Sequence, residues 1–404
     1  EGFGFSSPVV WHDRVFLTTA SPGPDGFWPA DGGDRRWVLC FDRADGTLLW
    51  KTEVPAARPE KTNPHNGHAS STPATDGERV YAYFGNHGLQ ALDFDGNIVW
   101  HRELGPFNAF QGTAASPLLH GDKVIISQDH RGPSGSFIAA FDKTTGEPIW
   151  RTERSAEVGW GSPVAIRAWG REQIVLSGSH EVISYEPETG EEIWRASGTT
   201  VETIPTPVVA ESLLFCSSGR AGPTLAIRPD GAGDVTETHI VWQSPKGSPY
   251  VASPVVHDGV LYMVNDTNGV ATAYEAATGE LLWQERLGRA RRAQSFYASP
   301  IAVNDRIYFT DDAGNTYVVR AGREFELPRL GGAPRRLGLR LDRGHVAGVP
   351  DRGQHPERRD RLARARLRQG QRRRGRRQAG HPGRERGAAR NGARRGHWRC
   401  PRSS

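Results

Sequence analysis

The stretch that decides the fold is residues 138–150, which read Ile138-Ala139-Ala140-Phe141-Asp142-Lys143-Thr144-Thr145-Gly146-Glu147-Pro148-Ile149-Trp150. An apolar run ends at Asp142, a polar turn reaches Gly146, and a short segment ends at Trp150. A short hairpin loop built on a type I turn needs a residue with positive φ before the next strand, and glycine adopts that conformation without steric cost. An aspartate at the loop start can bond the turn backbone. The stretch therefore predicts a β-hairpin.

The same hairpin recurs through residues 1–327. In five units Trp follows the turn glycine by four positions, at Gly46/Trp50, Gly96/Trp100, Gly146/Trp150, Gly190/Trp194 and Gly279/Trp283. The fifth unit along the chain is stretched, from Gly231 to Trp242, which indicates an insertion in its hairpin. The six tryptophans could stack a ligand. A propeller blade must be apolar on both faces, however, and this predicts that they pack between sheets.

A second marker opens each unit, a Ser or Thr followed by Pro and apolar residues. Its seven copies are Ser7-Pro8, Thr72-Pro73, Ser116-Pro117, Ser162-Pro163, Thr206-Pro207, Ser253-Pro254 and Ser299-Pro300. From the second copy onward the prolines are 44, 46, 44, 47 and 46 residues apart, and the first gap of 65 contains a Gly- and Pro-rich insertion. This period predicts an all-β propeller of four-stranded blades, seven visible here and eight in the intact protein. We expect the innermost strands to begin just before each Ser-Pro pair.

The formal charge of +5 averages two unlike pieces. Residues 328–404 hold 24 Arg, no Lys and 5 acidic residues, or +19, which leaves −14 on residues 1–327. The acidic body has no basic footprint for a nucleic acid. No stretch approaches the roughly 18 apolar residues of a membrane helix. The three cysteines are too few for a disulfide scaffold, and we expect Cys40 and Cys216 to be small buried strand residues.

Residues 328–404 form a separate Arg/Gly-rich tail that we expect to be disordered. The tail is rich in Arg, Gly, Ala and Pro and lacks Ile, Phe, Tyr, Met, Thr and Lys. A GC-rich gene read out of frame yields this composition, so our hypothesis is a frameshift near codon 327. The alternative is a genuine basic arm that binds nucleic acid or another polyanion. Only Trp398 would be available in it to stack bases.

The pattern of an apolar run, an acidic residue, Thr-Gly and a following Trp resembles the PQQ-type β-propeller repeat. That repeat occurs in quinoprotein dehydrogenases and in BamB-like outer-membrane assembly factors. The Asp of a WD40 repeat is absent, because the Trp is followed by Lys51, His101, Arg151, Arg195, Gln243 or Gln284. The resemblance implies a periplasmic or otherwise extracytoplasmic protein, although this chain shows no signal peptide.

Scaffolds and enzymes share this repeat, so the resemblance leaves two functions open. The dehydrogenases typically carry two adjacent cysteines over the quinone, with calcium ligands and an Asp base. Here Cys40 and Cys216 lie in different units, and no catalytic residue can be carried over. We therefore expect a monomeric, non-catalytic scaffold, without cofactor or metal, that binds a protein through a propeller face or by β-augmentation. The alternative is a PQQ- and calcium-dependent alcohol or sugar dehydrogenase, or a quinone-binding relative.

Ligands of propellers usually approach the central channel and the loops at one end. The candidate residues at this channel rim are His68, Gln111, Trp160, Tyr250 and Tyr297. They could cover a flat cofactor or a peptide strand, or they could plug a narrow channel. His65 and His68 lack a third ligand for a metal. We expect Gln128-Asp129-His130-Arg131 to be a solvated turn.

Overall fold

The computed structural model describes residues 3–21, 35–55, 66–109, 111–132, 135–210, 212–219, 222–244, 247–288 and 295–327. The chain divides into two compact units, Glu1–Gly338 and Leu339–Ser404, and every described residue belongs to the first. The predicted tail and the insertion at residues 22–34 lie outside the described residues. None of the helices in the described ranges is long and apolar enough to cross a membrane.

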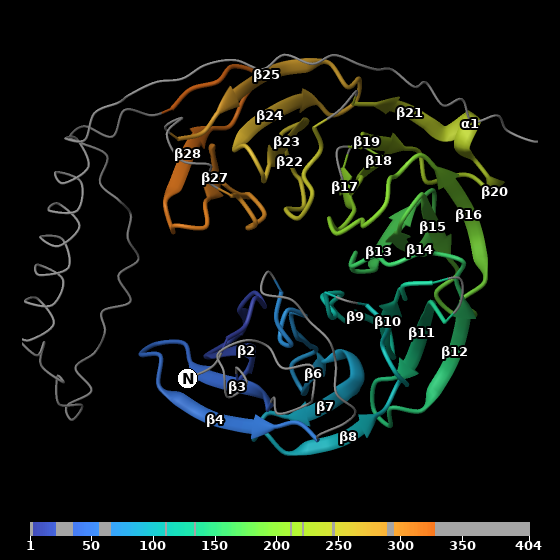
Figure 1. The fold of residues 1–404 in the computed structure, drawn as a ribbon, viewed down its shortest axis with the longest axis vertical. Helices are drawn as coiled ribbons and strands as arrows, with labels where there is room; N and C mark the ends of the chain where they lie inside the picture. The colour runs from blue at the N-terminus through green and yellow to red at the C-terminus, as the bar shows by residue number, and fades with distance from the viewer. Residues whose placement is uncertain are drawn as a thin grey trace, which may run out of the picture. The chain divides into compact units, whose positions relative to one another are not determined.

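Seven antiparallel sheets, called blades 1 to 7, follow one another around a centre (Figure 1), and the predicted all-β propeller is confirmed. Blade 1 contains β1 (Val9–Trp11), β2 (Arg14–Ala20), β3 (Arg36–Asp42) and β4 (Leu48–Glu53); blade 2 contains β5 (Ala74–Thr75), β6 (Arg79–Tyr83), β7 (Leu89–Asp93) and β8 (Ile98–Arg102). Blade 3 contains β9 (Leu118–His120), β10 (Lys123–Gln128), β11 (Phe137–Asp142) and β12 (Pro148–Glu153); blade 4 contains β13 (Val164–Ala168), β14 (Arg171–Ser177), β15 (Glu181–Tyr185) and β16 (Glu192–Ser197).

The remaining blades follow the same order, innermost strand first. Blade 5 contains β17 (Val208–Ala210), β18 (Leu213–Ser217), β19 (Thr224–Ile227) and β21 (Ile240–Gln243); blade 6 contains β22 (Val255–His257), β23 (Val260–Asn265), β24 (Val270–Glu275) and β25 (Leu281–Arg286). The described part of blade 7 contains β26 (Ile301–Val303), β27 (Arg306–Thr310) and β28 (Thr316–Arg320). The predicted insertion of the fifth unit forms β20 (Gly233–Asp234) and α1 (Thr236–His239), and β20 pairs in parallel with β16 of blade 4.

The innermost strands begin after each Ser-Pro or Thr-Pro pair, so the expectation that they begin before it was wrong. β1 starts at Val9 and β9 at Leu118, each directly after the proline. Proline has no N–H to donate to a strand ladder, and this places it outside the strand.

In five of the six described steps, the hydroxyl of the Ser/Thr-Pro pair links a blade to the one before it, a role that sequence reasoning missed. The backbone N–H of one copy donates to the hydroxyl of the next, from Ser7 to Thr72 (3.0 Å), Thr72 to Ser116 (3.0 Å), Ser116 to Ser162 (3.0 Å), Thr206 to Ser253 (2.9 Å) and Ser253 to Ser299 (3.0 Å). The described step from Ser162 to Thr206 has no such bond. The repeated hydroxyl therefore sets the spacing of the innermost strands.

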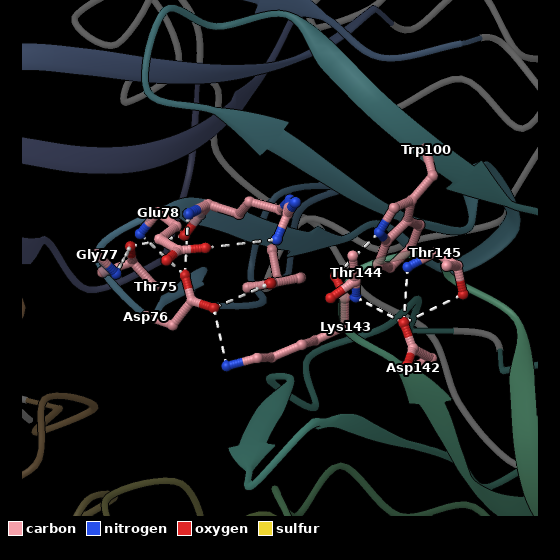
Figure 2. A network of polar contacts seen from close by, with 11 residues as sticks. Thr75, Asp76, Gly77, Glu78, Trp100, Asp142, Lys143, Thr144 and Thr145 are labelled. Atoms are coloured by element: carbon pink, nitrogen blue, oxygen red, sulfur yellow. Dashed lines mark hydrogen bonds and ion pairs between the residues drawn. The ribbon is translucent and has the colours of Figure 1, made fainter.

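The outer strands are joined through tryptophan, and the predicted packing role is confirmed. The indole Nε1 of Trp100 in blade 2 donates to the carbonyl of Lys143 in the hairpin of blade 3 at 3.1 Å (Figure 2). A Cβ on Gly146 of that hairpin would lie 2.6 Å from the ring of Trp100. Gly96, Gly190 and Gly279 lie in the same way against Trp50, Trp150 and Trp242. The turn glycine thus also makes room for the tryptophan of the preceding blade.

The apolar core lies between blades. Ile125, Ala140 and Trp150 of blade 3, for example, pack with Leu176 and Ile183 of blade 4. Six such clusters join blades 1–2, 2–3, 3–4, 4–5, 5–6 and 6–7. Within the described ranges, no cluster joins blade 7 to blade 1. Each inner blade therefore depends on two neighbours, and each end blade on one.

Candidate functional site

The five predicted rim residues lie at one end of the sheets. Each lies in a loop that leads from the outermost strand of one blade to the innermost strand of the next; His68, for example, lies between β4 and β5. In an antiparallel meander these inter-blade loops share an end with the loops between the second and third strands. We call this the loop end. The hairpins drawn in Figure 2 lie at the opposite end.

Trp160 is a plug at the loop end. Its side chain is 4% exposed and packs with Phe107 and Val158. The indole Nε1 donates to the carbonyl of Gly112 at 2.7 Å, and the backbone N–H donates to the carbonyl of Thr203 at 2.9 Å. Gly112 belongs to the preceding inter-blade loop and Thr203 to the following one. Trp160 therefore joins three successive loops.

His68, Gln111 and Tyr250 are also held by neighbouring blades. Buried Arg36 donates from Nη2 to Nδ1 of His68 at 2.9 Å. Because a guanidinium only donates, His68 accepts at Nδ1. The Tyr250 hydroxyl donates to Oε2 of Glu202 at 2.8 Å. The backbone carbonyl of Gln111 accepts from Nδ2 of Asn66 at 2.6 Å.

Tyr297 differs from the other four, because its side chain is 50% exposed. It stands two residues before Ser299, the place that Trp160 holds before Ser162. Phe5 holds the same place before Ser7 and is also exposed. The loop end of the described chain therefore presents aromatic surface at blades 7 and 1 and closed packing at blade 3.

Asp129, expected in a solvated turn, lies instead in a buried ion pair, so that expectation was wrong. Arg154 donates from Nε to Oδ1 of Asp129 at 2.9 Å and from Nη2 to Oδ2 at 3.3 Å. Its Nη1 donates to the hydroxyl of Tyr185. Burial opposes the charge of Arg154, but Asp129 and Tyr185 hold its pKa above the ordinary value. The partners are distant in sequence, and no local pattern announces them.

Asp266 is a buried carboxyl group of the loop end that is only partly hydrogen-bonded. It is fully buried, and its Oδ1 accepts the backbone N–H of Tyr250 at 2.7 Å. Among the described residues, nothing bonds its Oδ2. Burial raises the pKa of this carboxyl. The group can hold a proton, but no cluster of three His, Cys, Asp or Glu side chains suited to a metal ion occurs in the described part.

Trp160 offers no ring face on which a flat quinone such as PQQ could stack. Stacking a flat ring needs an accessible aromatic face, and Trp160 is enclosed by other side chains. Cys40 and Cys216 are buried free thiols in blades 1 and 5, and burial raises the pKa of both. Neither can form the disulfide of adjacent cysteines that is expected of an enzyme of that type.

This chain is similar in sequence and in fold to known proteins. A family model described as "Outer membrane protein assembly factor BamB" matches residues 4–139 and 134–374. BamB of Burkholderia pseudomallei (strain K96243) is 26% identical over 306 residues, covering 69% of this chain and 70% of that protein. Quinohemoprotein alcohol dehydrogenase of Comamonas testosteroni is 23% identical over 305 residues, covering 66% and 40%. The crystal structure of BamB from Moraxella catarrhalis matches the fold with a TM-score of 0.57 at 16% identity, covering 81% and 85%.

Proposed function

The chain belongs to the family of the outer membrane protein assembly factor BamB, and on that premise we propose that it is a non-catalytic scaffold that binds a protein partner. We place its role in the assembly of outer membrane proteins, because two relatives are named as assembly factors for such proteins. It also places the protein outside the cytoplasm.

The arrangement of the loop end is the observation that supports binding over catalysis. Trp160, Tyr250 and Arg154 hydrogen-bond to other protein groups. A catalytic acid or base must lie within reach of a substrate proton, whereas these groups fasten loops to one another. The exposed side chain of Tyr297 supplies the kind of aromatic surface enriched in protein interfaces.

The test is functional replacement in a Gram-negative host whose own BamB gene has been removed. The chain is exported behind a secretion signal, and folded outer-membrane β-barrels are measured by their heat-modifiable mobility on gels. We expect this protein to restore their level. An exported, folded chain that restores nothing would contradict the proposal.

A matched pair of variants locates the binding surface. Tyr297→Asn removes the exposed aromatic of the loop end and should weaken replacement. Trp169→Asn removes an equally exposed aromatic from the turn between β13 and β14, at the opposite end, and should leave replacement intact. Equal effects of the two variants would argue against the loop end.

The similarity to quinohemoprotein alcohol dehydrogenase keeps one alternative, a PQQ-dependent enzyme. Titration with PQQ and calcium, followed by dye-linked oxidation of alcohols and sugars, separates the two. We expect no turnover. Saturable PQQ binding with turnover would replace the scaffold by an oxidoreductase.

A further inference from the structure

His130 is a buried histidine at the loop end of blade 3. It lies between β10 and β11, and only 9% of the residue is exposed. The ring nitrogen Nε2 is buried and has no hydrogen-bond partner among the described residues. A protonated imidazole has an N–H group at each of its two ring nitrogens. Protonation would therefore place a charge, and at Nε2 an N–H without an acceptor, among packed side chains.

The imidazole of His130 packs against the inter-blade loop that leads from blade 2 to blade 3. It contacts the ring of Phe107 edge-on, with centroids 5.5 Å apart and an angle of 83° between the planes. The next residues of the two loops are hydrogen-bonded to each other. The backbone N–H of Arg131 donates to the carbonyl of Asn108 at 2.7 Å, and Nδ2 of Asn108 donates to the carbonyl of Arg131 at 3.1 Å. His130 thus lies where the two loops are joined.

Phe107 connects this contact to Trp160. The two side chains pack together with Val158 in one buried cluster. Trp160 donates to the carbonyl of Gly112, which belongs to the same inter-blade loop as Phe107, and to that of Thr203 in a later loop. A change in the position of Phe107 would therefore be transmitted to the residues that enclose Trp160.

The charged groups around this imidazole are already paired with one another. Both carboxylate oxygens of Asp129 accept from Arg154, at 2.9 and 3.3 Å. On β12, Nε of Arg151 donates to Oε1 of Glu153 at 2.7 Å. Residues 105–109 of the facing loop contain no charged side chain. A protonated imidazole would have to compete with an arginine for each nearby carboxylate.

The energetic preference of the closed packing is for neutral His130. Burial lowers the pKa of His130 below its ordinary value of 6.5, because it opposes the charged form. Asp129 and Glu153 act in the opposite direction and Arg151 in the same one, but burial is the larger effect. In an opened loop the imidazole would be hydrated and would bind a proton near its ordinary pKa. The closed packing is therefore fully stable above that ordinary value and becomes less favourable as the pH falls below it.

We propose that His130 is an acid-sensitive latch of the loop end. Neutral His130 holds Phe107, and through it Trp160, in the closed packing at blade 3. Protonation in acid releases the contact with Phe107, and both aromatic side chains become accessible to solvent. The latch is a property of the chain alone and does not rest on the proposed function.

The test is hydrogen exchange of the full chain, followed by mass spectrometry at about pH 7.5 and about pH 5, on either side of the ordinary histidine pKa. Intrinsic exchange is slower in acid, so the rates are corrected for it. Peptides that contain Phe107 or Trp160 should then exchange roughly fivefold faster or more at the lower pH, because opening hydrates the charge. Peptides from β14 and β15 of blade 4 should show no such increase.

A matched pair of histidine variants assigns the response. His130→Phe keeps a ring that packs on Phe107 but binds no proton, so the response to acid should disappear. His180 lies in the corresponding loop of blade 4, between β14 and β15, and is exposed. His180→Asn introduces a residue that tolerates its φ of 72° and should leave the response unchanged.

Two outcomes would overturn the inference. One is equal exchange at the two pH values for peptides with Phe107 or Trp160, in a chain that is folded by circular dichroism. The other is a response to acid that His130→Phe retains, which would assign it to another group, such as Asp266. If His130→Phe does not fold, the equally uncharged His130→Gln takes its place in the comparison. Neither readout depends on outer-membrane assembly, so both failures leave the proposed function standing.

Discussion

At the scale of single residues, two turn glycines allow the stability cost of backbone strain to be distinguished from that of a packing clash. Gly46 and Gly146 share a positive φ, but only Gly146 lies against a tryptophan ring. We expect Gly46→Ala to lower the free energy of unfolding by about 1 kcal/mol, from left-handed backbone strain alone. Gly146→Ala should cost about 3 kcal/mol, because the added Cβ also collides with Trp100. Urea unfolding measures both, and equal losses would contradict the packing role.

Asp266 should make stability depend on pH. Because burial raises its folded-state pKa above the ordinary 3.8, its ionisation opposes folding. The penalty is absent below that ordinary value, grows up to the folded-state pKa, and is complete above it. Asp266→Asn keeps an acceptor for the Tyr250 N–H, and a buried neutral amide costs less than a buried charge.

The variant Asp266→Asn should therefore melt at a higher temperature than the unmodified protein at about pH 7 and show no gain at about pH 3. Thermal melts followed by circular dichroism at the two pH values check this. The same gain at both would show that ionisation of Asp266 is not its cause.

At the scale of strands, the hydroxyl links between innermost strands should carry measurable stability. Ser162→Ala removes the acceptor of the Ser116 N–H in the link between blades 3 and 4. Ser7→Ala removes a hydroxyl that receives no such bond in the described chain. We expect a loss of about 1 kcal/mol for the first and close to none for the second, measured by urea unfolding. Equal losses would mean that the hydroxyls act through something other than these links.

One blade shows how an inserted segment changes its neighbour. β20 pairs with the outer edge of β16, where Ile193 is buried, while Leu49 and Ile149 at the same place before their tryptophans are exposed. Trp194 in this blade donates to Oε1 of Gln173 at 2.8 Å rather than to a carbonyl of the next hairpin. The fifth-unit insertion was visible in the sequence, but its strand partner was not.

At the scale of the molecule, six interfaces for seven described blades predict unequal local stability. Blades 1 and 7 each have one packed face, so their amides should open more readily than those of blade 3, which has two. Hydrogen exchange followed by mass spectrometry should show faster exchange in β1–β3 and β26–β28 than in β10 and β11. Uniform protection across all blades would contradict this and indicate that the two end faces are covered.

The local sequence was sufficient for the strands, the hairpins and their order. A hairpin is a contact between residues close in the chain, so the acidic residue, the glycine and the tryptophan at fixed spacing predict it in five units. The Ser/Thr-Pro period likewise predicted seven visible blades, and the described part of the chain contains seven sheets. At the candidate site the sequence placed five residues at one end of the sheets, but it could not say which of them were enclosed.

Only the packing of segments distant in sequence decided which residues each side chain contacts. Trp100 contacts Gly146, Arg154 binds Asp129, and Trp160 binds Gly112. The partners in each pair are far apart in the sequence, so no local pattern predicts them. Val10 and Leu119 occupy the same repeat position, yet Val10 is exposed and Leu119 packs in a core, because among the described residues only blade 3 has a neighbouring blade on that side. The burial of a residue depends on the blade that packs against it. A repeating sequence places the same types of residue at that position whether or not a neighbouring blade is present.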